Sequence, residues 1–474
     1  MTIKPIPAGG FETTIPVLII GGGAAGLCAA LAAHEAGVEL AVLERDPLPR
    51  GSTALSAGLI PAAATRFQLA LGITDRPELF ADDIDQKSHH QADAEIVDLV
   101  AAQSGSTVEW LADRYGLPFS VVSDFDYPGH AARRMHGLPS RSGAELLDRL
   151  REAVEQAGVP LLTDATVTAL FSDGDHRVRG VEVTRPDGTL DLIGCDVLIL
   201  ACNGYGGNPA LVARHIPEMR GALYFGHPGN RGDAVLWGEA LGARLRHMSG
   251  YQGHGSVAHP HGILISWAAI MEGGFQVNAN GLRFSNESLG YSEQAAAVIA
   301  EPDAVAFDIF DARIAAIARQ FEDFRQAEAG GAVIVADSIE ALATRLKLSE
   351  VVLKASFDEV EQLKRDRGSD RFGRHFAGVP PLAPPFMAVR VTGALFHTQG
   401  GLAVDCSARV LDGAGVAMPN LFAAGGAAAG VSGSQASGYL SGNGLLTATV
   451  LGRVAGTAAA SLVRSSQPRT DATD

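Results

Sequence analysis

Three glycines and a glutamate near the N-terminus have the spacing of a site that binds phosphate and ribose. Gly21, Gly23 and Gly26 form a G-x-G-x-x-G pattern, and Glu44 follows about 20 residues later. Gly21 permits a tight turn, Gly23 lets the backbone approach a pyrophosphate, and Gly26 lets a helix pack closely on a strand. The carboxylate of Glu44 can accept hydrogen bonds from a ribose. This spacing predicts a dinucleotide site.

The elements that must position this site are readable around it. An apolar run, Val17 to Ile20, precedes the glycines and predicts a buried strand, and an Ala/Leu-rich helix follows them. A second apolar run, 39–43, ends just before Glu44. The helix N-terminus would offer unpaired N–H groups and the positive end of its dipole to the phosphates. The order strand, turn, helix, strand, acid makes the glycine pattern far more specific than it is alone.

Length and composition indicate a large globular protein. The chain has 474 residues, enough for two or three domains, and 47% of them are hydrophobic. A net charge of −16 argues against binding to nucleic acid and to an anionic membrane surface. We expect a small-molecule substrate, no nucleic-acid partner and no membrane span, and the sequence leaves the oligomeric state open.

The four cysteines indicate neither a metal site nor a disulfide framework. Cys28, Cys195, Cys202 and Cys406 form no C-x-x-C pair and no C-x-x-C-H haem motif. The N-terminus lacks the basic and apolar blocks of a signal peptide, so we expect a cytoplasmic protein. The polar tail, Ser465 to Asp474, is expected to be disordered.

The fold class expected is α/β, with a discontinuous Rossmann-like domain and an inserted α+β capping domain. Short apolar runs alternate with amphipathic helices in the first half, and the pattern returns near the C-terminus. We expect the nucleotide-binding domain at 1–250 and 392–474, and the cap at 251–391. The elements predicted are helices at 143–160, 335–349, 350–367 and 443–463, and strands at 161–170, 178–184, 196–200 and 421–426.

Five ordered segments resemble the fumarate reductase/succinate dehydrogenase flavoprotein superfamily, which includes the 3-ketosteroid dehydrogenases. The resemblance covers nearly the whole chain. It is carried by the N-terminal fingerprint, RGSTALSAG (50–58), LACNGYGGNP (200–209), VNANGLRFSNESLGY (277–291), and HTQGGLAVD (397–405) with the C-terminal GYLSGNGLLTATVLGRVAG (438–456).

The resemblance implies that the nucleotide is FAD. Members that bind FAD covalently carry a His in the second segment, whereas Gly51, Ser52, Thr53 and Ala54 offer none, so we expect a non-covalent flavin. The family's Ala-Gly-Glu or Ala-Gly-Asp is Ala-Gly-Gly here, at 424–426. The cofactor contacts expected are Gly21, Gly23, Ala24, Ala25, Gly26, Glu44, Arg45, Ser52, Thr53, Ser56, Gly58, Val167, Ala201, Gly204, Asp233, Gly425, Asn443 and Leu445.

One reading of the active site follows the fumarate reductases. Arg283, in GLRF, would then be the proton donor, and His254 and His397 would bind the substrate. The Glu and Arg that feed this donor in the family fall at Trp267 and Ile270 here, and the C-terminal carboxylate-binding Arg falls at Tyr439. A buried carboxylate without a bidentate Arg partner would be poorly compensated.

The other reading follows the 3-ketosteroid dehydrogenases. In that group a Tyr after the G-x-R-F-x-N-E segment removes the proton beside the ketone, and Tyr291 has this spacing. A second Tyr donates to the ketone oxygen, where Tyr439 fits, helped by a backbone N–H of Gly442 or Asn443. Tyr127 matches a third family Tyr. Phenol and N–H donors would stabilise the enolate as in an oxyanion hole.

The resemblance favours an FAD-dependent dehydrogenase that introduces a C=C bond α,β to a ketone, such as an oxocyclohexane derivative or a 3-ketosteroid. An external acceptor would then take the electrons. Two alternatives stay open: a reductase of an unsaturated acid or ketone with Arg283 as proton donor, and a flavin-binding protein without turnover. The neighbouring Arg133 and Arg134 are predicted to be solvated surface residues.

Overall fold

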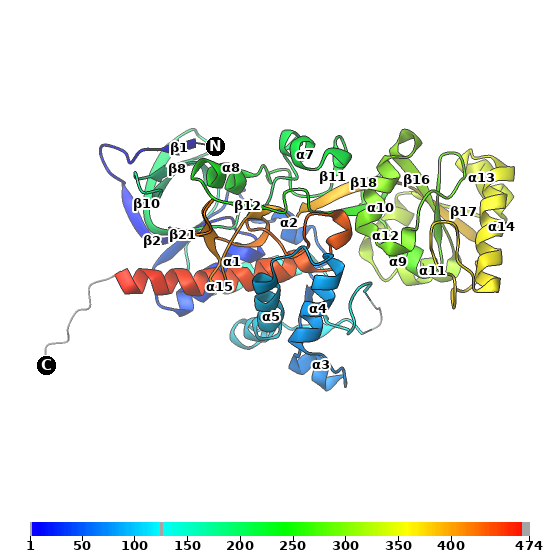
Figure 1. The fold of residues 1–474 in the computed structure, drawn as a ribbon, viewed down its shortest axis with the longest axis horizontal. Helices are drawn as coiled ribbons and strands as arrows, with labels where there is room; N and C mark the ends of the chain where they lie inside the picture. Colours follow the sequence, from blue (N-terminus) through cyan, green and yellow to red (C-terminus); the bar gives the residue numbers. More distant parts are fainter. Residues whose placement is uncertain (1, 124–126, 467–474) are drawn as a thin grey trace. The chain divides into compact units, whose positions relative to one another are not determined.

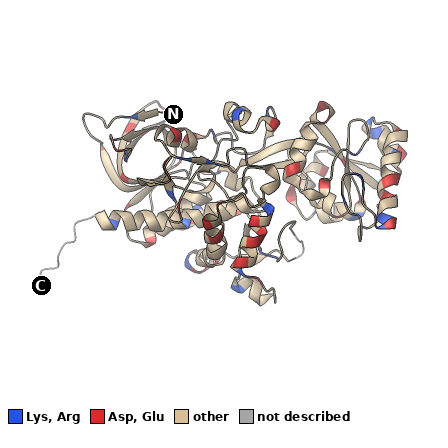
Figure 2. Cartoon of the chain, in the orientation of Figure 1, with Lys and Arg blue, Asp and Glu red and all other residues tan. Residues whose placement is uncertain are grey.

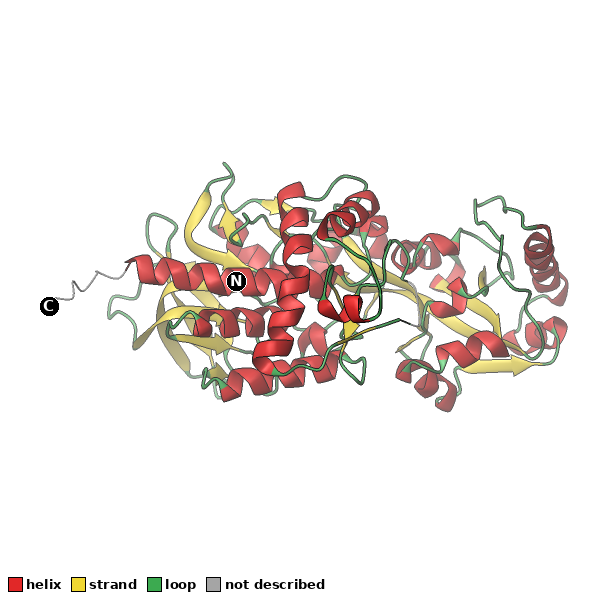
Figure 3. Ribbon diagram, turned by 90° about the horizontal axis from the view of Figure 1, so that it is seen from below, coloured by secondary structure: helices red, strands yellow, loops and turns green. Residues whose placement is uncertain are grey.

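The computed structural model describes residues 2–123 and 127–466, and these fall into two compact units (Figure 1). The first unit contains 1–216, 226–251 and 397–474, and the second contains 217–225 and 252–396. The end of the polar tail, 467–474, lies outside the described residues, as do 124–126. The helices and strands of each unit can be followed in Figure 3.

The first unit is built on a mixed sheet whose centre is parallel. Its strands run in the order β1, β8, β9, β10, β2, β3, β7, with β21 beside β10 and β20 beside β21. The strands are β1 (Thr2–Lys4), β2 (Thr13–Ile20), β3 (Leu40–Leu43), β7 (Leu161–Leu162), β8 (Thr166–Ser172), β9 (Val178–Thr184), β10 (Leu190–Leu200), β20 (Arg409–Leu411) and β21 (Ala417–Ala423). Strands β21, β10, β2 and β3 are parallel neighbours, which brings their C-terminal ends to one edge of the sheet.

Helices of the first unit cover this sheet and carry the cofactor motif. They are α1 (Ala24–Glu35), α2 (Gly51–Ala54), α3 (Arg66–Ala70), α4 (Pro77–Lys87), α5 (Ala94–Tyr115), α6 (Gly143–Gln156), α7 (Pro209–His215), α8 (Asp233–Ala240) and α15 (Asn443–Ser466). Two small sheets complete the unit, one of β4 (Ile60–Pro61), β5 (Ser120–Val121) and β6 (Met135–Gly137), the other of β12 (Leu245–Arg246) and β19 (Gly401–Leu402).

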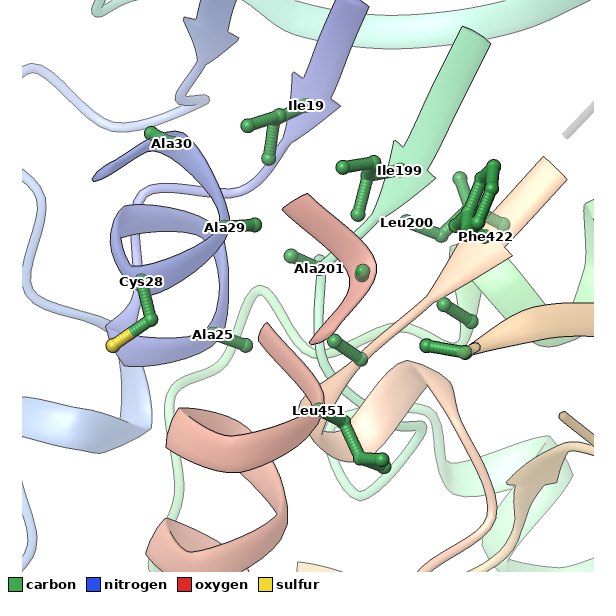
Figure 4. Close-up of a cluster of buried hydrophobic side chains, with 14 of the residues drawn as sticks. Ile19, Ala25, Cys28, Ala29, Ala30, Ile199, Leu200, Ala201, Phe422 and Leu451 are labelled. Atoms are coloured by element: carbon green, nitrogen blue, oxygen red, sulfur yellow. The ribbon is translucent and has the colours of Figure 1, made fainter. Parts of the chain in front are cut away.

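Helices α1 and α15 pack together in the core of the first unit. A Cβ on Gly452 or Gly456 would lie 2.4 Å from the carbonyl oxygen of Ala25 or 2.1 Å from that of Ala29, so only glycine permits this approach. Figure 4 shows Leu451 of α15 together with apolar side chains of α1, β2, β10 and β21. By length and composition α15 could cross a membrane, yet 61% of its most apolar stretch is buried within the unit. That packing makes α15 a core helix of the first unit.

The second unit is a smaller sheet with helices. Its sheet runs β14, β13, β18, β16, β15, with β11 and β17 also on β18. The strands are β11 (Leu223–Tyr224), β13 (Tyr251–Ala258), β14 (Ile263–Leu264), β15 (Phe275–Asn278), β16 (Val305–Asp311), β17 (Val333–Ala336) and β18 (Phe386–Thr398), and the helices are α9 (Ala268–Met271), α10 (Tyr291–Ile299), α11 (Ala312–Ala318), α12 (Glu322–Ala329), α13 (Ile339–Leu346) and α14 (Glu350–Asp366). Acidic residues are spread over outer helices such as α4 and α14 (Figure 2).

The structure corrects several predicted boundaries. The helix predicted from 335 begins only at Ile339, because Val335 and Ala336 pair with β18 and the Ser338 hydroxyl caps the helix by accepting from the N–H of Ala341. The helix predicted at 143–160 ends at Gln156, before Gly158, which has φ +73°. The strand predicted at 161–170 is two strands, β7 and β8.

The prediction that Arg134 is a solvated surface residue is wrong. Its side chain is fully buried and forms an ion pair with Asp75 at 2.9 Å, whereas its neighbour Arg133 is exposed. Asp83 is a second ion-pair partner of Arg134. A buried arginine requires such paired acids, and these lie too far along the chain to be recognised from the sequence.

Candidate functional site

The glycine pattern forms the turn that the sequence predicts. Gly21 has φ +111°, and a Cβ at that position would lie 2.4 Å from the carbonyl oxygen of Ala201 on the neighbouring segment. A Cβ on Gly26 would lie 1.9 Å from the carbonyl oxygen of Gly21. Helix α1 therefore begins directly at the end of β2, and its first turn contains Ala24 and Ala25. The N–H of Ala24 donates to the Thr53 hydroxyl, so the next backbone N–H groups of this first turn are the ones that a phosphate could use.

Glu44 and Arg45 continue the site at the end of β3. Each carboxylate oxygen of Glu44 accepts a backbone hydrogen bond, Oε2 from the N–H of Gly22 at 2.7 Å and Oε1 from that of Asp46 at 2.9 Å. The guanidinium of Arg45 donates to the carbonyl oxygen of Gly229 at 2.7 Å. These bonds hold the two side chains at the sheet edge where the glycine turn lies.

The segment after β3 is attached to the start of α1. The Thr53 hydroxyl accepts from the N–H of Ala24 at 3.1 Å, and the Ser52 hydroxyl accepts from the Asn230 amide at 2.8 Å. The Ser56 hydroxyl accepts from the N–H of Gly58 at 3.1 Å and so shapes the same loop. The loop thus brings hydroxyl groups beside the helix N-terminus.

These segments of the first unit enclose a cleft with about 660 Å³ of empty space, its open mouth included. We call it the cofactor cleft. The predicted cofactor residues that line it are Gly21, Gly23, Glu44, Arg45, Ser52, Thr53, Val167, Ala201 and Asp233. The other predicted residues, which are not among its lining, are Ala24, Ala25, Gly26, Ser56, Gly58, Gly204, Gly425, Asn443 and Leu445.

Two buried polar atoms in the cofactor cleft fit a polar ligand. Asp233 Oδ1 and Trp237 Nε1, both on α8, have no hydrogen-bond partner among the described residues, and both side chains line the cleft. Burial raises the pKa of Asp233, against the opposing effect of Arg45. An acceptor and a donor left unpaired beside a glycine turn match the hydroxyl and phosphate groups of a dinucleotide. The residues present therefore fit FAD.

Asn203 lines the cofactor cleft, and sequence reasoning did not select it. It has φ +66°, and its Oδ1 accepts from the N–H of Gly204 at 2.7 Å. A Cβ on Gly426 would lie 2.3 Å from that oxygen and 2.9 Å from Nε2 of His397. The glycine at 426, where the resembling family has an acid, therefore fits a space that Asn203 already fills. The sequence signal for this residue is the Asn in LACNGYGG, at a position where the resembling family has Gly.

Tyr439 lies in the turn before α15. Burial raises the pKa of its phenol to about 12, against the lowering effect of hydrogen bonds from the backbone at Gly444 and Gly442. The phenol is therefore protonated at neutral pH and able to donate a hydrogen bond. Gly442 has φ +87°, and a Cβ there would lie 2.6 Å from Pro61, so glycine is required at this position. Its backbone hydrogen bond to the phenol is one of the two that lower the pKa of Tyr439, and its role toward a substrate carbonyl stays a prediction.

Three further predicted residues of the first unit have defined surroundings. The Gln399 amide donates to Nδ1 of His397 at 2.9 Å, and burial lowers the pKa of His397 to about 4, so this imidazole is neutral at pH 7 with its proton on Nε2. Tyr127 packs against Leu59, Val122 and Met135. Asn443 donates to the Ser432 hydroxyl at 3.2 Å.

In the second unit Tyr291 belongs to a group of aromatic rings, which we call the aromatic cluster: His254, Trp267, Tyr291 and Phe396. Tyr291 is the first residue of α10, and its ring stacks on His254 with centroids 5.0 Å apart. Burial lowers the pKa of His254 to about 3, and its Nδ1 accepts from the N–H of Ser256 at 3.1 Å. His254 is thus a neutral ring whose Nε2–H can donate to a ligand.

Arg283, also in the second unit, is held by acids. Its side chain is 3% exposed and lies 2.6 Å from the carboxylate of Glu287, and it forms a further ion pair with Asp370. Burial lowers the pKa of Arg283, but the two acids outweigh it and raise the pKa overall. A guanidinium stabilised in this way is a poor source of protons.

The structure therefore brings Tyr291 and His254 together in the second unit, while the ion pairs of Arg283 are with Glu287 and Asp370. Tyr439, Gly442, His397 and Tyr127 belong to the first unit. The catalytic and substrate-binding roles of all these residues stay predictions.

Comparison with known proteins gives consistent matches. A family model described as "FAD binding domain" matches residues 16–445. A curated relative, the probable fumarate reductase Ifc3 of Shewanella frigidimarina (strain NCIMB 400), is 31% identical over 461 residues, covering 96% of this chain and 76% of the relative.

Two solved structures have the same fold. The open conformation of a flavocytochrome c3 fumarate reductase matches with a TM-score of 0.81 and 29% identity over 96% of this chain and 80% of that chain. A 3-ketosteroid-delta4-(5alpha)-dehydrogenase from Rhodococcus jostii RHA1 matches with a TM-score of 0.74 and 24% identity over 96% of this chain and 99% of that chain. The chain belongs to the FAD-binding domain family and is an FAD-dependent oxidoreductase.

Proposed function

We propose that this protein is an FAD-dependent dehydrogenase that introduces a C=C bond α,β to a ketone. The observation that carries the proposal is the state of Arg283, whose guanidinium is enclosed by Glu287 and Asp370. An arginine held by two buried acids is unsuited to donate a proton to an unsaturated acid. Two phenols, Tyr291 and Tyr439, are left as the groups suited to proton transfer and carbonyl binding.

The proposed roles follow from the protonation states. Tyr439, with a pKa raised to about 12 by burial, donates a hydrogen bond to the ketone oxygen. Such a donor stabilises the enolate-like charge that develops there, typically by about 3 kcal/mol. Tyr291, the first residue of α10, takes the α-proton as the general base. Bound FAD would supply the acceptor for the hydride that leaves the β-carbon.

The two histidines support a neutral substrate group. The pKa values of His254 and His397 are lowered to about 3 and about 4, so neither ring is a cation at neutral pH. Each ring can still donate from Nε2 to an oxygen of the substrate. These properties suit a cyclic ketone, such as an oxocyclohexane derivative or a 3-ketosteroid, better than a dicarboxylate. An external carrier then takes the electrons.

A second candidate is a reductase of an unsaturated acid or ketone. The 31% identical relative named a probable fumarate reductase favours it. This reaction needs either a proton donor other than Arg283 or a state of the protein in which Asp370 and Glu287 do not hold the guanidinium of Arg283.

The experiment that separates the candidates uses both redox directions. The purified oxidised protein is mixed with a dye acceptor and one ketone, which is cyclohexanone, 4-oxocyclohexanecarboxylate or a 3-ketosteroid. The masses of the products are then measured by mass spectrometry. The proposal predicts dye reduction and a product lighter by two hydrogens. Anaerobic mixing of the reduced protein with fumarate is predicted to leave the flavin reduced. Rapid flavin reoxidation by fumarate without any ketone oxidation would establish the second candidate instead.

A further inference from the structure

A group of buried polar side chains in the first unit lies outside the residues to which the proposed function gives a role. Arg134 is at its centre, with a side chain that is 0% exposed. Its Nη2 and Nε donate to the two carboxylate oxygens of Asp75 at 2.9 and 3.0 Å, and Asp83 accepts from Nη1. The guanidinium also lies 4.5 Å from the centre of the Phe80 ring. Acids and an aromatic face therefore fix this cation in one place.

Arg134 also fixes the state of His130. Its Nη1 lies 3.3 Å from Nδ1 of His130, and a guanidinium can only donate, so Nδ1 is the acceptor. The proton of the neutral imidazole is then on Nε2, which lies 3.0 Å from the carbonyl oxygen of Ser441 and donates to it. Burial lowers the pKa of His130 to about 3, which keeps the ring in this neutral form.

Ser441 is in the turn that carries Tyr439 and Gly442. The same turn contacts the His130 segment through Leu440, whose Cδ1 would lie 2.8 Å from a Cβ on Gly129. The backbone at Gly442 and Gly444 donates to the phenol oxygen of Tyr439. The Ser441 carbonyl and the Gly442 N–H belong to one planar peptide unit, so the hydrogen bond from His130 to that carbonyl also fixes the direction of an N–H that contacts the phenol.

We propose that His130 is a positioning residue for the carbonyl-binding phenol: through its bond to Ser441 it holds the 439–442 turn so that the Tyr439 hydroxyl meets the ketone oxygen. Arg134, anchored by Asp75 and Asp83, keeps His130 in the donating tautomer. The inference rests on the role given to Tyr439 in the proposed function. Displacing a reacting or polarising group by about 1 Å costs on the order of 100-fold in rate.

The test compares two substitutions of His130. His130→Leu removes the donor and keeps an apolar side chain of similar size, whereas His130→Gln can accept from Arg134 with its amide oxygen and donate to Ser441 with its amide nitrogen. His34→Leu, an exposed position on α1, is the matched control. Amide hydrogen exchange of the peptide 438–446 reports the turn directly, and kcat and KM for an oxidised ketone report its use.

His130→Leu is expected to keep bound FAD, to exchange faster across 438–446, and to lose about 100-fold in kcat with KM nearly unchanged. His130→Gln is expected to stay within about tenfold of the wild type in kcat and to protect the peptide as the wild type does. Unchanged exchange in His130→Leu would overturn the inference. If the wild type oxidises no ketone, the proposed function fails, and the exchange of the peptide still decides whether His130 holds the turn.

Discussion

The cofactor cleft of the first unit and the aromatic cluster of the second unit are built in different ways. In the cleft, backbone geometry decides which residues are present: a Cβ on Gly21 or Gly26 would collide with a carbonyl oxygen. In the cluster, side chains decide the chemistry: the rings of Tyr291 and His254 stack on each other with centroids 5.0 Å apart. A site fixed by the backbone has a readable sequence pattern, whereas a site fixed by side-chain partners acquires its properties only on folding.

The first prediction tests the backbone side of this comparison. Gly26→Val is expected to purify without FAD, because its Cβ would lie 1.9 Å from the carbonyl oxygen of Gly21 and would force α1 away from β2. Flavin absorbance of the purified protein measures this. The control is Gly9→Val, where nothing lies within 4 Å of the new Cβ. A yellow Gly26→Val protein with normal FAD affinity would contradict the steric account.

The second prediction concerns the acids that hold Arg283 in the second unit. Arg283→Met leaves Asp370 buried without this cation, while Glu287 keeps its ion pair with Arg374, so the free energy of unfolding is expected to fall by about 3 kcal/mol. Urea denaturation measures the change. Lys354→Met is the control, because its ion pair with Asp358 is exposed and contributes little. Equal stability of the two variants would show that the Arg283 network is not structural.

The third prediction concerns Asn203 and Gly426 in the first unit. Gly426→Glu is expected to weaken FAD binding about 30-fold, since the new Cβ would lie 2.3 Å from Asn203 Oδ1. Adding Asn203→Gly removes this collision but leaves the 2.9 Å approaches to the N of Gly204 and to Nε2 of His397, so it is expected to recover part of the affinity, a coupling of about 1 kcal/mol. FAD titration of the single and double variants completes the cycle. Additive effects would mean that the two positions do not share one space.

The fourth prediction uses the pKa of His254. A folded-state pKa of about 3 lies below the ordinary value, so below pH 6.5 the unfolded chain binds a proton that the folded chain refuses. Stability from this group is therefore present at neutral pH and is lost as the pH falls from 6.5 towards 3. His254→Gln is expected to reduce the slope of unfolding free energy by about 1.4 kcal/mol per pH unit in that window. An unchanged slope would indicate that His254 is protonated in the folded protein.

The sequence was sufficient for the parts that local pattern and backbone determine. The strand, turn and helix at Val17 to Glu35 and the acid Glu44 follow from apolar runs and glycine spacing. The contact of Asn203 with Gly426 could not be predicted, because the two positions are far apart in the chain and meet only when β10 and β21 pair.

The charged residues show the same limit. Arg283 pairs with Asp370, 87 positions away, and Arg134 pairs with Asp75, 59 positions away. The sequence shows that an arginine is part of a motif, but it does not show whether the side chain faces water, substrate or buried acids. Only the folded structure distinguishes these cases. The sequence alone therefore predicts a solvated Arg134, which is in fact buried, and allows a catalytic role for Arg283.

The most direct test of the central claim, proton transfer by a phenol with Arg283 in a structural role, compares Tyr291→Phe with Arg283→Gln in anaerobic rapid mixing with a ketone that the wild type oxidises. Flavin bleaching is followed per mole of FAD bound, at a temperature where circular dichroism shows both variants folded. The account predicts about 1,000-fold slower bleaching in Tyr291→Phe and a rate within about tenfold of the wild type in Arg283→Gln. Near-normal bleaching in Tyr291→Phe together with its loss in Arg283→Gln would contradict the account.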